Sequence, residues 1–234
     1  MQCVVADQSA PYDIIANMQI VVAPNPILSE KAKAVLKADK SILHTIAKMK
    51  DVLSSAHDPI GVGLAAPQIG KSLQIFIAKP TPKGKVSVFI NPKITKMDTP
   101  SQSFTREHKI KNPKSKKEEV QKLEGCLSLK DIWGNVLRSP TVRLSYLDEK
   151  GKKHTRTFKG LLATIIQHEI DHLNGVLFTK RVLEQKGKLY KRKLLTFGYK
   201  SYKNKQSPVP DGTGQSLRSG ELKKGEEVFE ELEI

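Results

Sequence analysis

The sequence of 234 residues predicts a single domain that mixes helices with antiparallel strands. Two pairs of apolar, β-branched segments are separated by short turns, which is typical of hairpins. A segment at about 41–56 and another at 161–173 have their apolar residues at helical spacing. The expected structure is therefore a set of hairpins accompanied by two helices.

The N-terminal half begins with an extension at 1–17, followed by a predicted strand at 18–24, MQIVVAP. Apolar residues from Ile42 to Leu53 recur at i, i+3 and i+4, which predicts an amphipathic helix. The glycines and proline of GVGLAAPQIG, residues 61–70, predict a loop. The next segments, LQIFIA and VSVFINP, predict a hairpin that turns at KPTPKGK.

The C-terminal half contains a polar, lysine-rich stretch at about 95–122, which we expect to be a mobile basic insertion. The segment 141–160 predicts a second hairpin that turns at DEKGK. A buried helix follows and ends at Asn174 and Gly175. We expect the domain to span 18–197 and a flexible tail to occupy 198–234, where EEVFEELEI can pair as a strand with GKLYKRK.

The composition limits the partners and the compartment. A formal charge of +16 suits anionic partners such as ribosomal RNA, DNA or acidic membranes, although solubility explains it equally well. Two cysteines, Cys3 and Cys126, cannot form a disulfide framework, which favours a reducing compartment. No apolar run reaches membrane-spanning length, and the first residues resemble neither a signal nor a transit peptide, so we expect a cytoplasmic protein.

The second helix carries the pattern H-E-x-x-H, with His168, Glu169 and His172. Residues i and i+4 lie on one face of a helix, so both imidazoles can reach one ion about 2 Å away. Glu169 points about 100° around the helix, toward a water on that ion. Two ordinary surface histidines are the alternative, but the helix has a broad apolar face that predicts burial, and burying them without a partner is costly. The pattern therefore predicts a metal site.

The residue pattern alone does not identify the third protein ligand of the metal. The metzincin pattern fails because Phe178 stands where its third histidine belongs. Downstream carboxylates such as Glu184 and Glu221 are not on a convincing second helix. Cys126 would complete a Cys-His-His set with a position left for water, although a lone cysteine is more often a small core residue.

Three motifs in order, GVGLAAPQ, EGCLS and QHEIDH, resemble the signatures of peptide deformylases, and the similarity extends from about Met18 to Val182. The resemblance implies an α+β fold in which antiparallel β-sheets pack around a central metal-binding helix. It also implies removal of the N-formyl group from the initiator formyl-methionine of nascent polypeptides, in which a metal-activated water attacks the formyl carbon. The implied cofactor is one divalent ion, most often Fe(II), with Zn, Ni or Co as acceptable substitutes.

The resemblance also assigns roles to residues. It makes Cys126, His168 and His172 the metal ligands and Glu169 the general acid and base. The side-chain amide of Gln68 and the backbone N–H of Leu127 match the oxyanion donors. The remaining matched positions concern the substrate: Gly61 and Gly63 would let its backbone approach, and Val62, Leu161, Thr164 and Ile165 would line the methionine pocket.

One stretch of the chain departs from the family pattern, and one arginine that matches the pattern has an expected partner. Lys130 and Trp133 stand in a stretch where many relatives have a proline and then an arginine near the substrate, so contacts beyond methionine are in question. Arg138 matches a family arginine, and we expect it to pair with Asp171, with two solvated charges as the alternative.

Three other functions are compatible with parts of the sequence. The runner-up is a zinc endopeptidase of the HExxH type, which would not need Cys126. A basic RNA-binding module lacks stacking aromatics, since these are 6% of residues, and a thiol protease would keep its activity without metal. The expected partners are N-formylmethionyl nascent peptides and, through the basic surface, the ribosome, with neither DNA nor a membrane involved.

Overall fold

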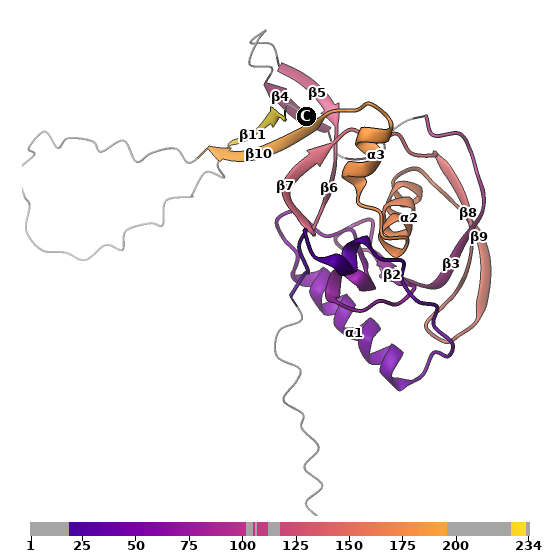
Figure 1. Ribbon diagram of the computed structural model, residues 1–234. Helices are drawn as coiled ribbons and strands as arrows, with labels where there is room; N and C mark the ends of the chain where they lie inside the picture. Colours follow the sequence, from indigo (N-terminus) through magenta and orange to yellow (C-terminus); the bar gives the residue numbers. More distant parts are fainter. Residues whose placement is uncertain (1–18, 102–104, 106, 112–117, 196–225, 233–234) are drawn as a thin grey trace, which may run out of the picture.

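The computed structural model describes residues 19–101, 105, 107–111, 118–195 and 226–232. Two sheets form the fold, and α2 and α3 lie between them in Figure 1. The first sheet has five strands in the order β1-β2-β3-β8-β9, and every neighbouring pair is antiparallel. Its strands are β1 Gly63–Ala65, β2 Ile75–Ala78, β3 Ser87–Met97, β8 Thr141–Leu147 and β9 Lys153–Lys159. Both hairpins predicted from the sequence are thereby confirmed.

Strand β2 is buried on both faces, which explains its uninterrupted apolar sequence. Phe76 and Ala78 belong to the core shared with α2, Gly160–Leu173. Ile75 and Ile77, which point to the opposite face, belong to the core shared with α1, Lys40–Ser55. The five-stranded sheet therefore has a helix on each side at this strand.

The second sheet has six strands in the order β5-β4-β11-β10-β7-β6. Its strands are β4 Glu107–Lys111, β5 Glu118–Lys122, β6 Glu124–Cys126, β7 Leu129–Gly134, β10 Leu189–Leu195 and β11 Glu226–Glu231. The expected pairing of the basic β10 with the acidic β11 is confirmed, and Lys193 lies 2.6 Å from Glu230 across it. Helix α3, Phe178–Glu184, packs against β6 and β7.

The expectation of a mobile insertion at 95–122 is wrong for residues 107–111 and 118–122, which form the antiparallel strands β4 and β5. Strand β4 pairs in parallel with β11, and Ile110 is buried in a cluster with Tyr190 and Phe229. Tyr190 and Phe229 lie far away in the sequence, so the insertion obtains part of its apolar contacts from the C-terminal strands.

Two shorter segments also differ from the prediction. The described part of 18–24 forms no strand, although its backbone donates hydrogen bonds from Val21 to Gln68 and from Ala23 to Ser128. Residues 61–70 are more regular than a loop, because β1 is followed by a 3-10 helix, η3 Ala66–Ile69; another, η2, spans Pro26–Ser29. The extension at 1–17 and most of the tail at 198–234 lie outside the described residues.

Helix α2 ends where the sequence predicts. Asn174 caps it, and Gly175 follows with a φ of 69°, which favours glycine. A Cβ at Gly175 would lie 2.5 Å from the carbonyl oxygen of Ser29, so space as well as conformation requires glycine there. This turn fixes the end of α2 against the N-terminal segment.

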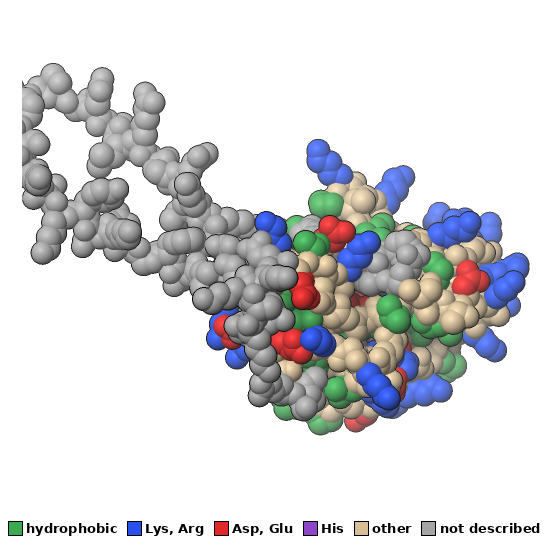
Figure 2. All heavy atoms as spheres, turned by 90° about the horizontal axis from the view of Figure 1, so that it is seen from above, with side chains coloured by type: hydrophobic (Ala, Val, Ile, Leu, Met, Phe, Trp, Pro, Cys, Tyr) green, Lys and Arg blue, Asp and Glu red, His purple; other side chains and the backbone are tan. Residues whose placement is uncertain are grey.

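Lysine and arginine side chains are spread over the face visible in Figure 2, with acidic side chains between them, and do not gather in one patch. None of the helices in the described part of the chain combines the length and apolar character needed to cross a membrane.

Candidate metal and active site

Helix α2 carries the three polar side chains of the H-E-x-x-H pattern. His168 and His172 are one helical turn apart, and their ring centroids lie 4.9 Å from each other. Glu169 and His172 are buried, and His168 is largely buried. Imidazole groups that are buried among apolar residues need partners, and strand β6 supplies one for each histidine.

Cys126 ends strand β6 and faces the histidines of α2. Its Sγ lies 3.2 Å from Nε2 of His172 and accepts a hydrogen bond from the backbone N–H of Ser128 at 3.4 Å. The donor atoms of Cys126, His168 and His172 all lie within 4.8 Å of one another. The fold thus brings Cys126 to two histidines that lie 42 and 46 positions further along the chain.

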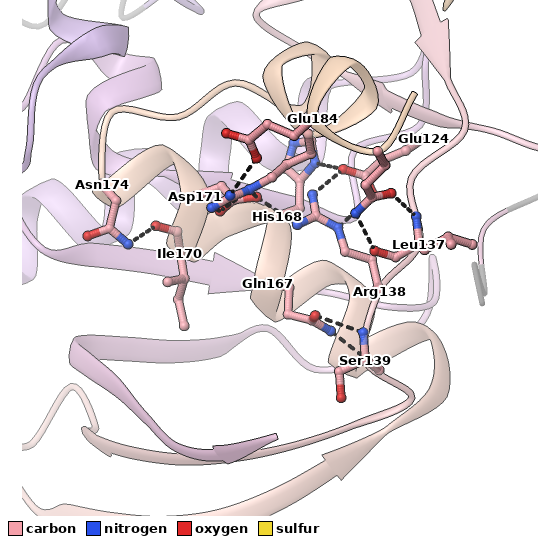
Figure 3. Close-up of polar contacts among 12 residues, drawn as sticks. Glu124, Leu137, Arg138, Ser139, Gln167, His168, Ile170, Asp171, Asn174 and Glu184 are labelled. Atoms are coloured by element: carbon pink, nitrogen blue, oxygen red, sulfur yellow. Dashed lines mark hydrogen bonds and ion pairs between the residues drawn. The ribbon is translucent and has the colours of Figure 1, made fainter. Parts of the chain in front are cut away.

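Glu124, two residues before Cys126, orients the first histidine (Figure 3). Nδ1 of His168 lies 2.6 Å from Oε1 of Glu124, so Nε2 is the ring nitrogen that can bind an ion. Burial alone would raise the pKa of Glu124, but the adjacent Arg138 and His168 outweigh it and lower this pKa to about 2. Glu124 is therefore ionised in the folded protein.

Arg138 joins Glu124 to helix α2 (Figure 3). Its Nε and Nη2 donate to the two oxygens of Glu124 at 3.1 and 2.6 Å, and Nη1 donates to Asp171 at 2.6 Å. The pairing of Arg138 with Asp171 expected from the sequence is thus confirmed, and both residues are buried. Arg181 of α3 also donates to Asp171, at 2.7 Å. The sequence reasoning gave no role to Glu124 or Arg181, although Glu124 opens the EGCLS motif.

Gln68 reaches the cluster from η3. Its Oε1 accepts from the backbone N–H of Ala65 at 2.8 Å, so the amide NH₂ must face the other way. There Nε2 donates to Sγ of Cys126 at 3.5 Å and to Oγ of Ser128 at 3.2 Å. The amide donor is therefore fixed beside the thiol.

Glu169 lies against strand β1. A Cβ on Gly63 would lie 2.2 Å from Oε1 of Glu169, so glycine makes room for this carboxylate. Oε2 of Glu169 is buried without a hydrogen-bond partner among the described residues. Burial raises the pKa of Glu169 to about 7, an effect that the neighbouring His168 partly opposes. A carboxyl group with this pKa can both accept and return a proton near neutral pH.

The cluster suits a divalent metal ion. Bonds of about 2.0–2.3 Å to nitrogen and sulfur bring the ligands of one ion within roughly 3–4.5 Å of one another, close to the observed spacing. Burial lowers the pKa of His172 well below its usual value, so this ring is neutral, as a ligand must be. One sulfur and two imidazoles form a set typical of zinc or iron, with a coordination position left over.

A cavity of about 470 Å³ opens in front of these groups. Every residue that the sequence assigns to the site lines it, except His172, which is buried: Gly61, Val62, Gly63, Gln68, Cys126, Leu127, Leu161, Thr164, Ile165, His168 and Glu169. The wall also contains residues without a sequence-based assignment, among them Asp58, Ile60, His108 and Arg192. Nothing in the local sequence of these residues signals a site, because the segment before β1, strand β4 and strand β10 contribute them from distant parts of the chain.

Known proteins resemble this chain over most of its length. The model of the polypeptide deformylase family matches residues 17–188. A peptide deformylase of Christiangramia forsetii is 34% identical over 192 residues, which is 76% of this chain and 87% of that protein. One of Chlorobaculum tepidum is 37% identical over 163 residues, 68% of this chain and 75% of that protein.

Solved structures agree. The crystal structure of the Thermotoga maritima peptide deformylase has a TM-score of 0.56 and 31% identity, and covers 70% of this chain and 95% of that one. The Synechococcus elongatus enzyme, solved in complex with actinonin, has a TM-score of 0.55 and 33% identity, with coverage of 70% and 79%. The fold, the cluster of Cys126 with two histidines and these similarities lead to one conclusion: the chain belongs to the polypeptide deformylase family.

Proposed function

We propose that this protein hydrolyses the N-formyl group of formyl-methionyl nascent polypeptides and releases formate. One observation carries the proposal: the donor atoms of Cys126, His168 and His172 lie within 4.8 Å of one another, and Cys126, His168 and the buried Glu169 line one cavity. The peptide deformylases that resemble the chain support it.

In this proposal α2 is the metal-binding helix at the centre of the fold, and Cys126, His168 and His172 hold one divalent ion. The bound ion would supply a water that is acidic enough to act as a nucleophile near neutral pH. Fe(II) is the proposed ion, and Zn, Ni or Co would suit the same ligands. Glu124 and Arg138 fix the ring of His168 from behind.

The side chains of the chain itself move protons and stabilise charge. Glu169 would accept a proton from the attacking water and return it to the departing amine, a role that its pKa of about 7 suits. Negative charge that develops on the formyl oxygen would be stabilised by the fixed amide of Gln68 and the backbone N–H of Leu127.

The substrate backbone would lie between two sheet edges. Strand β1 ends the five-stranded sheet and β6 ends the six-stranded sheet, and residues of both line the cavity. An extended peptide can pair with such edges, and Gly61 and Gly63 line the cavity where its backbone would approach. Four side chains are proposed to enclose the methionine side chain: Val62, Leu161, Thr164 and Ile165.

The site of action is proposed to be the cytoplasm, where a free thiol such as that of Cys126 persists. We also propose that the basic surface, with a formal charge of +16 for the chain, contacts the ribosome. Such contact would weaken as the salt concentration rises.

The test is formate release from formyl-Met-Ala-Ser by protein loaded with Fe(II) under anaerobic conditions. We expect steady turnover by the unaltered protein, and a loss of about 10²–10⁴-fold in the Glu169→Gln variant with its metal retained. Cys126→Ala should lose tight metal binding together with activity. Cleavage of an internal peptide bond, retained in Cys126→Ala, would indicate an endopeptidase instead.

A further inference from the structure

One wall of the cavity includes a residue that lies beyond the family match and another from the basic insertion. The family match ends at residue 188, whereas Arg192 of β10 lines the same cavity as Cys126 and Glu169. His108 of β4, part of the basic insertion, lines it as well. The insertion and the C-terminal strand therefore contribute to the candidate active site.

Arg192 ties this wall to the segment before β1. Its side chain is 4% exposed and forms an ion pair with Asp58, which also lines the cavity. Nη2 of Arg192 also donates to Asp131 of β7 at 2.8 Å. Unlike Asp58, Asp131 does not line the cavity. One guanidinium thus joins β10, β7 and the residues that lead directly to Gly61.

The rest of the wall is aromatic and apolar. The ring of Trp133 covers Gly125, the neighbour of Cys126, so closely that a Cβ there would lie 2.9 Å from it. The ring of His108 lies 4.7 Å from that of Trp133, and Phe229 of β11 supports Trp133 edge-on at 5.8 Å. Ile60 lines the same cavity with 45% of its surface exposed.

The position of this wall indicates what it contacts. Trp133 pairs with Gly125 across β6 and β7, one residue from the thiol, so the wall begins next to the metal cluster. A cavity of about 470 Å³ has the size of a pocket for a drug-sized molecule, which is larger than a formylmethionyl group. The cationic Arg192 is already paired with two carboxylates, so the wall does not offer an uncompensated positive charge to an acidic side chain.

We propose that Trp133, His108 and Ile60 form a subsite for a large apolar side chain at one of the two positions after methionine, and that Arg192 positions it through Asp58. This proposal rests on the proposed deformylase function and concerns the same cavity. The insertion and the C-terminal strands then have a function, because β4 carries His108 and β11 supports Trp133.

The first experiment measures kcat/KM of the metal-loaded, full-length protein for formyl-Met-Ala-Ser and for peptides with Phe or Glu at the second or third position. We expect about a fivefold gain for Phe at one of these positions, since part of an aromatic side chain becomes buried, and no gain for Glu. Equal values for the original residue, Phe and Glu at both positions would overturn the subsite. Formate from none of the peptides would contradict the deformylase function instead.

Ile60→Ser should abolish the preference for Phe. Leu36→Ser is the control, because Leu36 is 99% exposed and lies outside the cavity lining. A preference for Phe that survives in Ile60→Ser, or that disappears equally in Leu36→Ser, would contradict the assignment.

The positioning role has a matched pair of variants. Asp58→Asn weakens the ion pair between Arg192 and the cavity-lining Asp58. Asp131→Asn weakens the ion pair of the same guanidinium with Asp131 of the six-stranded sheet. The side chain of Asp58 is 59% exposed, and asparagine tolerates the positive φ of 61° at Asp131, so both variants should fold. We expect KM for the Phe peptide to rise about two- to fivefold in Asp58→Asn with kcat retained, and no change in Asp131→Asn. Equal effects of the two variants, or a fall in kcat alone, would overturn the positioning role.

Discussion

Oε1 of Glu124 accepts hydrogen bonds from two residues, lying 2.6 Å from Nδ1 of His168 and 2.6 Å from Nη2 of Arg138. One carboxylate oxygen thus connects the candidate metal ligand to a buried ion-pair network that continues to Asp171 and Arg181. The orientation of His168 therefore depends on residues that do not touch the ion.

Glu124→Gln should lower the metal affinity about 10–100-fold, because the amide no longer stabilises the imidazole as a charged acceptor does. The measurement is a competition titration with a chelator at fixed pH. Glu184→Gln is the control, since Glu184 pairs with Arg181 at the surface. Equal affinities for Glu124→Gln and the unaltered protein would show that the contact does not tune the site.

The same carboxylate predicts a dependence of stability on pH. The pKa of Glu124 is lowered in the folded protein from 4.5 to about 2, so the folded state holds fewer protons than the unfolded state between these values. This contribution to stability is complete above about pH 4.5 and is lost as the pH falls toward 2. Urea unfolding of the metal-free protein between pH 5 and pH 3 should show it, and Glu124→Gln should flatten the dependence. A slope that is unchanged in the variant would assign the effect to other carboxylates.

Arg138→Met should lower the free energy of unfolding by about 3–5 kcal/mol, because Glu124 and Asp171 then remain buried without their counter-ion. Arg138→Lys keeps the charge but cannot donate to both carboxylates in the same fork geometry, so an intermediate loss is expected. Chemical denaturation measures both. A loss below about 1 kcal/mol in Arg138→Met, as is typical of surface pairs, would contradict the burial of this network.

Gln68→Leu should reduce kcat about 10²–10³-fold while the protein keeps its metal, because one donor to the developing oxyanion disappears. The measurement pairs formate release with the metal content of the same sample. Gln74→Leu is a control of the same kind, since Gln74 donates to the backbone oxygen of Ala32 outside the cavity lining. An unchanged kcat would remove Gln68 from the catalytic machinery.

Activity should fall as the medium becomes more acidic, because Glu169 must be deprotonated to accept a proton from water. Its pKa of about 7 applies to the metal-free protein, and a bound cation shifts it downward by favouring the carboxylate. The acidic limb of the profile of kcat/KM against pH should therefore lie at or below about pH 7. If the acidic limb lay well above pH 8, the group whose deprotonation it reflects could not be Glu169.

The sequence predicted those parts of the fold that follow from local patterns. Helix α1 lies within one residue of the predicted range, and both hairpins of the five-stranded sheet were anticipated, because their apolar spacing and turns are contiguous in the chain. The pairing of β10 with β11 followed from complementary charge. Strands β4 and β5 were missed because Ile110 obtains its buried contacts from Tyr190 and Phe229, about 80 and 119 residues away.

The candidate site was found through a resemblance of three motifs, since composition and spacing alone left the third metal ligand open. The helix predicted that His168 and His172 share a face, and the fold then brings Cys126 to them. Glu124 was not assigned because a buried glutamate has no local signature; its role follows from Arg138 and His168, which approach from other elements. The same limit applies to Arg192 and Asp58, which are 134 positions apart.

X-ray absorption spectroscopy of the protein loaded with one Zn²⁺ ion tests most directly whether Cys126, His168 and His172 share a metal. We expect one sulfur at about 2.3 Å and two imidazole nitrogens at about 2.0–2.1 Å, with the sulfur absent in Cys126→Ser. A spectrum of the unaltered protein that shows only oxygen and nitrogen ligands would contradict it.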